Sequence, residues 1–253
     1  MKQEYRHMNI TMSKIRRLPT LLLLPLLLIW GNPAHAQAVG KITNLSGVLT
    51  ARHPDGSVRI MASKSDVMQG DTLITQANTY ARIKFVDNAE IVLRPASELI
   101  IKSYQYDAEK PANDKIAIGL TKGSLRAVSG LVGKRNPDAV SFDTPAATIG
   151  IRGTHFGALF CQNDCGGVPT PSGTTPANGL HVDVAQGAIV LTNPAGSQVF
   201  QSGQFGFIAN MNTPPVVIPP TQGIPLTMPL SISKNAPSMG PSSNAQGTAC
   251  IVR

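Results

Sequence analysis

Apolar and polar residues alternate in short runs between residues 39 and 208, and no run repeats apolar residues at helical spacing. Residues 81–85 (ARIKF) are the clearest case. Their first, third and fifth side chains would face a core, while Arg82 and Lys84 would face water. Gly, Asn, Asp and Pro separate these runs from one another. More than ten such segments predict an all-β fold.

Two longer stretches predict strands joined by turns. A turn at residues 87–89 would join the strand at 81–85 to a second strand at 90–94, giving a hairpin. Apolar residues at 180, 182 and 184 alternate in the same way with His181 and Asp183, which would face water. Gly187 would close that strand before another at 188–192.

A short internal repeat links the two ends of this region. Residues 47–57 and 187–197 each place two glycines nine positions apart, with Pro two positions before the second glycine and Ser directly after it. This pattern is typical of a strand, a tight turn and a second strand. Because repeated strand-turn units bury a core by stacking, we favour a β-roll or β-helix-like stack over a two-sheet sandwich.

Two Pro-rich or Gly-rich segments are expected outside the core. Residues 166–179 predict a mobile loop between two strands, and residues 211–253, with eight prolines, predict an extended, largely disordered tail. The predicted organisation is therefore a leader at 1–36, an all-β domain at 37–210, and a flexible tail at 211–253.

The N-terminal residues have the features of a secretory signal peptide. Basic residues at 14, 16 and 17 precede the apolar run 18–30, which Pro19 and Pro25 interrupt, and Ala34-His35-Ala36 follows. We predict cleavage after Ala36, with the general secretory route favoured over twin-arginine export. Since the first cysteine is Cys161, no lipid attachment is expected at the cleavage point.

Charge and composition narrow the classes of function. The leader contains five of the 22 basic and one of the 14 acidic residues, so its removal lowers the net charge from +8 to +4. Nucleic-acid binding is therefore not expected. Charged residues make up 14% of the chain, which argues against a charge-driven disordered protein. No apolar stretch after the leader is long enough to span a membrane.

Residues 140–156 (VSFDTPAATIGIRGTHF) resemble the closing signature of the FecR-type domain, a module of bacterial envelope regulators. Earlier segments agree in order: 39–51 with its opening strands, 70–75 with its Gly-Asp turn, 82–93 with its hairpin and 119–125 with a strand pair. The resemblance covers 39–160, and extra strands are expected at 180–208. Asn88-Ala89 stands where the family more often has glycine, so that turn is expected to differ in type.

The resemblance implies a periplasmic or secreted all-β module that acts in sensing or interaction. The best-known family members relay the state of an outer-membrane transporter to a cytoplasmic sigma factor. At most 17 residues precede the apolar run here, so direct contact with a sigma factor is not expected.

The three cysteines predict at most one local disulfide. Cys161 and Cys165 flank a turn, and their thiols would join in an oxidising compartment. Cys250 would stay free, pair between chains, or exchange with the other two. A metal site formed by these two cysteines with His155 or His181 lacks paired Cys-x-x-Cys spacing, so no metal and no cofactor is predicted.

The segment containing Arg152, Gly153 and Thr154 is the candidate motif for ligand or structure. Its glycines suit a tight backbone bend, and the guanidinium would bind a carbonyl or a carboxylate. A structural role is favoured. The alternative is that Arg152 presents its charge to an anionic ligand.

Signatures of an enzyme are weak. Residues 130–135 (GLVGKR) lack the first glycine and the Ser or Thr of a phosphate loop, and predict a basic turn. A polysaccharide hydrolase or lyase would need carboxylates such as Asp66, Asp71, Asp87 or Glu90, which lie mostly in turns. Sugar-binding proteins often stack the sugar ring on a flat Trp or Tyr side chain. The one Trp belongs to the leader, so only tyrosines remain for this role, and both sugar-related functions are less favoured.

The sequence therefore predicts a non-catalytic, exported FecR-like module that binds an envelope protein in signalling or envelope organisation. The alternative is a binder or processing enzyme of envelope polysaccharide, and a purely structural envelope role ranks third.

Overall fold

One mixed β-sheet of 15 strands dominates the protein. The computed structural model describes residues 37–227, so the expected leader at 1–36, its cleavage point and Cys250 lie outside the described residues. Strands account for 53% and helices for 6% of these described residues. The predicted all-β fold class is therefore confirmed.

The elements follow one another along the chain in an order that contains many hairpins. They are β1 (Ala38–Ser46), β2 (Leu49–Arg52), β3 (Val58–Met61), β4 (Asp66–Met68), β5 (Thr72–Thr75), β6 (Tyr80–Phe85), β7 (Glu90–Leu93), β8 (Glu98–Gln105), the 3-10 turn η1 (Pro111–Asn113), β9 (Lys115–Val128), α1 (Leu131–Arg135), η2 (Pro137–Ala139), β10 (Val140–Asp143), β11 (Thr148–Cys161), β12 (Gly179–Asn193), β13 (Gly196–Gln201), β14 (Phe205–Ile208) and β15 (Val216–Ile218).

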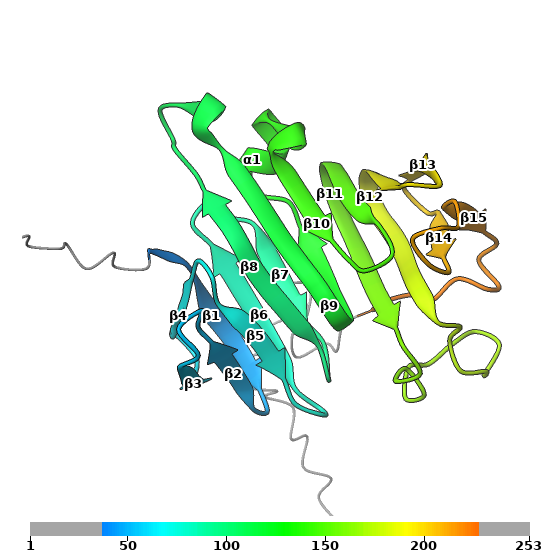
Figure 1. The fold of residues 1–253 in the computed structure, drawn as a ribbon, viewed down its shortest axis with the longest axis horizontal. Helices are drawn as coiled ribbons and strands as arrows, with labels where there is room; N and C mark the ends of the chain where they lie inside the picture. Colours follow the sequence, from blue (N-terminus) through cyan, green and yellow to red (C-terminus); the bar gives the residue numbers. More distant parts are fainter. Residues whose placement is uncertain (1–36, 228–253) are drawn as a thin grey trace, which may run out of the picture. The chain divides into compact units, whose positions relative to one another are not determined.

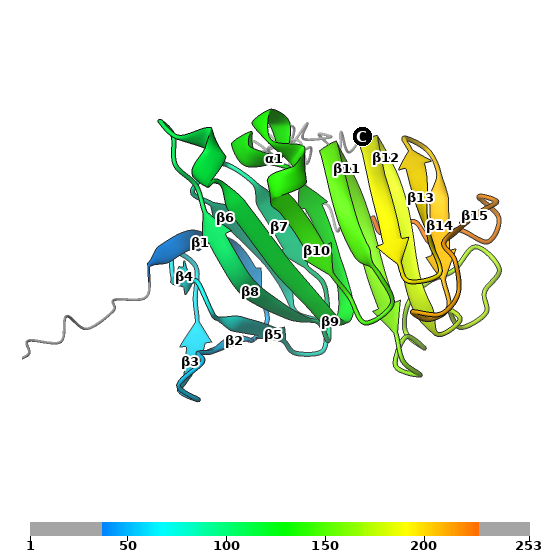
Figure 2. The same cartoon turned by 45° about the horizontal axis from the view of Figure 1, so that its top comes forward.

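The sheet forks at β9. One arm continues from β9 through β7, β6 and β1 to β4, and the other continues through β8, β5 and β2 to β3. On its opposite edge, β9 pairs in parallel with β10 and antiparallel with β11. The arms lie one in front of the other, with β8 and β5 nearer the viewer than β7 and β6 (Figure 1, Figure 2). The sheet is thereby rolled over on itself.

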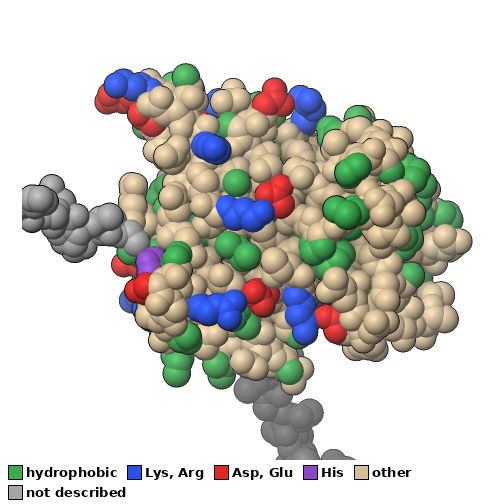
Figure 3. Space-filling model, in the orientation of Figure 1, with side chains coloured by type: hydrophobic (Ala, Val, Ile, Leu, Met, Phe, Trp, Pro, Cys, Tyr) green, Lys and Arg blue, Asp and Glu red, His purple; other side chains and the backbone are tan. Residues whose placement is uncertain are grey.

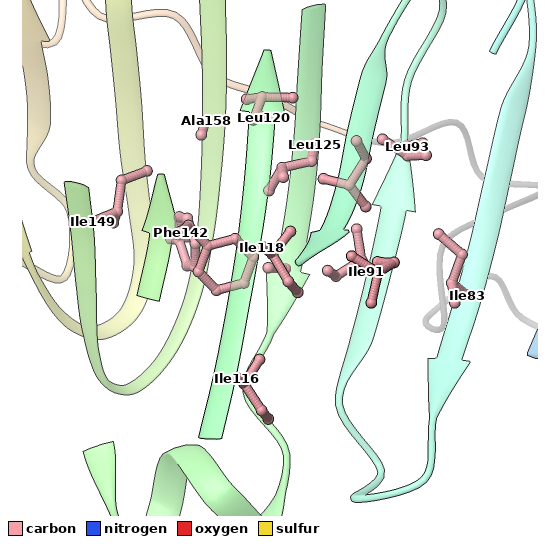
Figure 4. Packing of buried hydrophobic residues seen from close by; sticks show 14 of the residues in the cluster. Ile83, Ile91, Leu93, Ile116, Ile118, Leu120, Leu125, Phe142, Ile149 and Ala158 are labelled. Atoms are coloured by element: carbon pink, nitrogen blue, oxygen red, sulfur yellow. The ribbon is translucent and has the colours of Figure 1, made fainter. Parts of the chain in front are cut away.

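The hydrophobic core fills the space between the two arms. A single cluster of buried apolar residues includes Ile83 and Leu93 from one arm and Leu73 and Leu99 from the other. Figure 4 shows side chains from β6, β7, β9 and β10 directed into this space. Burying each such side chain contributes roughly 1.5–3 kcal/mol, so this interior is the main source of stability.

Three glycines lie where long strands of the sheet bend and change partners. Gly123 in β9, Gly153 in β11 and Gly187 in β12 all have positive φ, at 73°, 60° and 74°. A Cβ atom on Gly187 would lie 2.3 Å from the carbonyl oxygen of Gly153. Each strand changes partners at its glycine: β12, for example, pairs with β14 before Gly187 and with β13 after it. The glycines allow three long strands to serve both layers.

The two copies of the sequence repeat both form antiparallel hairpins. Residues 47–57 lead from β2 into β3, and residues 187–197 lead from β12 into β13. The first and second glycine of each copy have positive φ. The hairpin predicted from residues 81–94 is also present, as β6 and β7. At its turn Asn88 adopts φ 65°, the left-handed conformation that a glycine would otherwise supply.

Two expectations for the C-terminal third were wrong. The strand at 180–184 does not end at Gly187, because β12 runs on through the bend to Asn193. His181 and Asp183, expected to face water, are buried. The cause is the segment 222–227, which we call the strap: it lies over the outer face of β11 and β12, with Ile224 and Leu226 packed on Leu159.

The folded region therefore extends past residue 210, where the flexible tail was expected to begin. β15 pairs with β14, and Leu226 is fully buried. Apolar residues spaced between the prolines of this segment explain the difference, because they give the chain enough buried surface to dock. Residues 228–253 lie outside the described part. Residues 162–178 connect β11 to β12, so the loop predicted at 166–179 lies within this connection except for Gly179, which begins β12.

Candidate functional site

The β2–β3 hairpin ends one arm of the sheet with an open edge. In the described residues β3 pairs only with β2. Val58 is 63% exposed and Ile60 is 82% exposed, and both point to the outer face. An edge strand leaves a row of backbone N–H and C=O groups free to pair with another chain. β3 thus combines unsatisfied backbone groups with apolar side chains.

A buried aspartate holds this edge in place. Asp71, which is fully buried at the turn before β5, accepts hydrogen bonds from Nη2 of Arg59 (2.8 Å), Nδ1 of His53 (3.0 Å) and the backbone N–H of Met68 (2.9 Å). Arg59 belongs to β3 and His53 to the hairpin turn. The carboxylate therefore ties the hairpin to the body of the protein. A strand fixed in this way loses little conformational freedom when it binds.

The other edge strands of the described region carry features that block pairing. β15 lies between Pro214-Pro215 and Pro219-Pro220, and proline donates no backbone hydrogen bond. β4 is three residues long and begins at Asp66, which is ion-paired with Lys41. The edge strand β13 carries polar residues at three of its six positions. The strand β3 has neither a flanking proline nor a polar outer face.

The outer face of the β8 arm is occupied by paired charges. Lys102 contacts Asp143 at 2.9 Å, Arg52 contacts Glu98 at 3.4 Å, and Lys122 contacts Asp164 at 3.5 Å. The side chains of these pairs remain partly exposed, and Figure 3 shows basic and acidic groups side by side on this face. Such pairs contribute little stability and present no large patch of one sign.

The candidate motif at residues 152–154 is structural at two of its three positions. Gly153 supplies the bend of β11, and the backbone N–H of the buried Thr154 donates to Oγ of Ser129 at 2.9 Å. The Arg152 side chain is 60% exposed and lies 3.9 Å from Asp138, in a shallow groove of about 290 Å³. Anion binding by Arg152 stays a prediction.

The predicted disulfide is present. Cys161 and Cys165 are bonded, with Cα atoms 5.6 Å apart, and both pack in the small cluster beneath the strap. Their sulfurs are therefore not thiolates available to a metal ion. Among residues 37–227 there is no group of three or more His, Cys, Asp or Glu side chains suited to hold a metal.

The carboxylates considered for polysaccharide chemistry have separate structural partners. Asp87 is fully buried and accepts from Oη of Tyr104 (2.5 Å) and from the backbone N–H groups of Ala89 (3.0 Å) and Val132 (3.2 Å). Burial, together with the Asp87 charge, raises the pKa of Tyr104 above its usual value. This carboxylate joins the β6–β7 turn to the start of α1. Asp71 anchors the hairpin, Asp66 pairs with Lys41, and Glu90 lies on β7.

The basic turn expected at 130–135 is the short helix α1. Its last residue, Arg135, donates from Nε and Nη2 to the two carboxylate oxygens of Asp114, both at 2.8 Å, and lies over the ring of Tyr106. These hydrogen bonds lower the pKa of Asp114, although burial opposes the shift. The guanidinium is thus committed to holding the loop at 106–114.

One buried polar cluster was not predicted from the sequence. Nη1 of Arg126 donates to Asp183 at 2.8 Å and to the carbonyl of Leu226 at 3.1 Å, and its Nε donates to His155 at 2.7 Å. Gly157 of β11 lies between Asp183 of β12 and Arg126 of β9 in the paired strands. The absence of a side chain at Gly157 therefore makes room for the ion pair. Arg126 and Asp183 are each flanked by apolar residues in their strands, and this pattern was the available signal.

Comparison with protein families agrees with this architecture. Residues 71–190 match the family model described as FecR protein, a span that runs from the anchoring aspartate into β12. The chain carries a FecR domain. The strands β1 to β4, including the open edge of β3, precede the matched residues. The FecR domain supports a signalling or regulatory role. In the comparison with curated proteins, none matches the chain.

Solved structures show more distant likeness. Two crystal structures of a candidate anti-sigma factor from Parabacteroides distasonis have TM-scores of 0.45 and 0.43 at 10% and 11% identity. In each case 60% of this chain and 60% of the other are covered, so the FecR chain spans less than two thirds of that protein. A structure titled cell surface anchoring domain has a TM-score of 0.24 at 29% identity, covering 24% of this chain and 82% of that one. Among the helices of residues 37–227, none has the length and apolar character to cross a membrane.

Proposed function

We propose that this protein is an exported, non-catalytic FecR-type module that acts in envelope signalling or organisation by binding a partner protein in the periplasm or outside the cell. The FecR match supports the regulatory part of this proposal. The leader predicted at 1–36 supports export. The observation that carries the binding role is the open, apolar edge of β3.

The occupant of this edge is an extended segment of another protein, added as a further strand. Strand addition obtains affinity from backbone hydrogen bonds and specificity from alternate side chains. The partner segment would place apolar residues beside Val58 and Ile60, on the outer face of the sheet. Arg59, between them, is already committed to Asp71 and does not oppose docking.

The size of the edge favours a transient partner over a second copy of this chain. Four residues of strand extend roughly 13 Å. A stable dimer needs about 1,200–2,000 Å² of buried surface, which so short an edge does not provide by itself, whereas transient signalling contacts are smaller.

Site-specific photo-crosslinking in cells tests this proposal. A photoreactive residue at position 60 should give one dominant adduct with a partner protein, whereas the same residue at position 217 of the proline-flanked β15 should not. In the protein that carries the probe at position 58, Ile60→Lys should abolish the adducts. The matched control Val217→Lys, with the same probe, should retain them. A product of two copies of this chain, or equal adducts from positions 60 and 217, would contradict the proposal.

A further inference from the structure

A cavity of about 300 Å³ lies on the outer face of the sheet, far along the chain from the β3 edge. Its floor is formed by β12, β14 and β15, which neighbour one another at one end of the sheet (Figure 2). Residues 170–177 of the long loop and residues 222 and 224 of the strap form its walls. This volume is at the lower end of the range for small-molecule sites.

The floor holds an imidazole with an unused acceptor. His181 is 6% exposed and packs on Phe207, with ring centroids 4.7 Å apart. Its Nε2 lies 2.8 Å from the carbonyl of Ala177 and must donate there, so Nδ1 of the neutral ring carries a lone pair. Nδ1 is buried and has no hydrogen-bond partner in the described structure. A buried polar atom without a partner costs about 1–3 kcal/mol unless a ligand or water satisfies it.

The walls supply hydroxyl groups. Thr170, Ser172 and Thr174 line the cavity and bond to one another, with Oγ of Ser172 lying 2.7 Å from Oγ1 of Thr174. Hydroxyls both donate and accept, so they can rearrange around a ligand that carries hydroxyls of its own. Gln222 adds an amide on the strap side.

The described residues that line this cavity include no Asp, Glu, Lys or Arg. The apolar part of the lining includes Phe207, Ile218 and Ile224. An ionic ligand would lose its hydration here without gaining a counter-charge. The lining therefore suits a neutral molecule with one apolar face and several hydroxyls.

We propose that this cavity binds one neutral pyranose unit of a saccharide. The C–H face of the sugar ring packs against Phe207, one sugar hydroxyl donates to Nδ1 of His181, and others bond to the hydroxyls of residues 170–174. This site is separate from the β3 edge and does not depend on the proposed protein partner. It gives the FecR module a second ligand of a different chemical class.

Calorimetric titration of the whole protein with glucose, galactose, mannose and N-acetylglucosamine tests this assignment. At least one of the four should bind saturably with one site per chain. His181→Phe keeps a ring on Phe207 and removes the acceptor, so it should weaken binding about tenfold. Phe207→Ala should weaken it by at least as much. Thr192→Ala, in the groove of Arg152, and Ile60→Lys should leave it unchanged.

Nitrogen NMR of the histidine rings gives a second readout. Saturating sugar should shift the Nδ1 resonance of His181 as that atom accepts a hydrogen bond. The assignment is overturned if none of the four sugars shows saturable binding, or if both His181→Phe and Phe207→Ala bind like the unaltered protein. Loss of sugar binding would leave the crosslinking test at position 60 unaffected, so the two proposals fail separately.

Discussion

Asp71 and Arg59 form a 2.8 Å ion pair in which the Asp71 side chain is completely buried and the Arg59 side chain is 42% exposed. The pair joins the turn before β5 to the middle of β3. Asp71 is also the first residue of the family match, whereas Arg59 lies outside it. A feature of the FecR domain therefore positions a strand that precedes the matched region.

Replacing this aspartate should destabilise the protein strongly. Asp71→Ala leaves the Met68 N–H and two side-chain donors without their acceptor, so we expect the free energy of unfolding to fall by about 3 kcal/mol. Asp66→Ala, which breaks an exposed pair with Lys41, should cost less than about 1 kcal/mol. Urea unfolding of both variants measures the difference, and equal losses would contradict the anchoring role.

The bend glycines should be more sensitive to substitution than other glycines with positive φ. Gly187→Ala adds both a strained left-handed residue and a methyl group 2.3 Å from the carbonyl of Gly153. We expect a loss of about 3 kcal/mol or more, because the opposing atom is backbone. Gly203 has φ 86° and open space around it, so Gly203→Ala should cost only about 1–2 kcal/mol. Similar thermal unfolding of the two variants would argue against a bend fixed at this position.

The sequence was sufficient for the fold class and for several local elements. Alternation at 81–85 predicted a hairpin that is present, because side chains of a half-buried strand must alternate. The closely spaced pair Cys161 and Cys165 predicted the disulfide. The glycines of the repeat predicted turns, since a positive φ is a local requirement that the sequence records directly.

Contacts between distant segments could not be predicted in the same way. Alternation placed His181 and Asp183 on the outer face correctly, but nothing local shows that the strap covers that face. Asp71 was recognised only as part of a turn, because its partners His53 and Arg59 are 18 and 12 residues away. The bent form of the sheet depends on three glycines in three separate strands, and the change of partner strand at each glycine exists only in the folded protein.

The strap should contribute substantially to stability. Leu226 is fully buried against Leu159 and the disulfide, so Leu226→Ala should lower the free energy of unfolding by about 2–4 kcal/mol. Val217 on β15 is 46% exposed, and Val217→Ala should change it by no more than about 0.5 kcal/mol. Chemical denaturation of both variants checks this expectation. A negligible effect of Leu226→Ala would show that the strap is not docked in solution.

Acid should destabilise the protein partly through His181. Burial lowers the pKa of this imidazole below its usual value of 6.5, and the hydrogen bond to Ala177 only partly opposes the shift. As the pH falls below 6.5, the unfolded chain takes up a proton before the folded one does. The contribution to stability is therefore complete above pH 6.5 and is lost as the pH falls towards the folded pKa.

Removing the imidazole should make stability less dependent on pH in this range. For His181→Phe, the slope of unfolding free energy against pH below 6.5 should be smaller by up to about 1.4 kcal/mol per pH unit. Denaturation at a series of pH values between 7 and 5 measures the two slopes. Parallel curves for the variant and the unaltered protein would assign the acid sensitivity to other groups.

The central claim is that a partner adds a strand to β3, and amide hydrogen exchange on the complex tests it most directly. The partner identified by crosslinking at position 60 would be purified and mixed with the full chain. Exchange at residues 58–61 should slow markedly on binding, while exchange at 216–218 of the proline-flanked edge stays the same. Protection elsewhere with unchanged exchange in β3 would contradict the account.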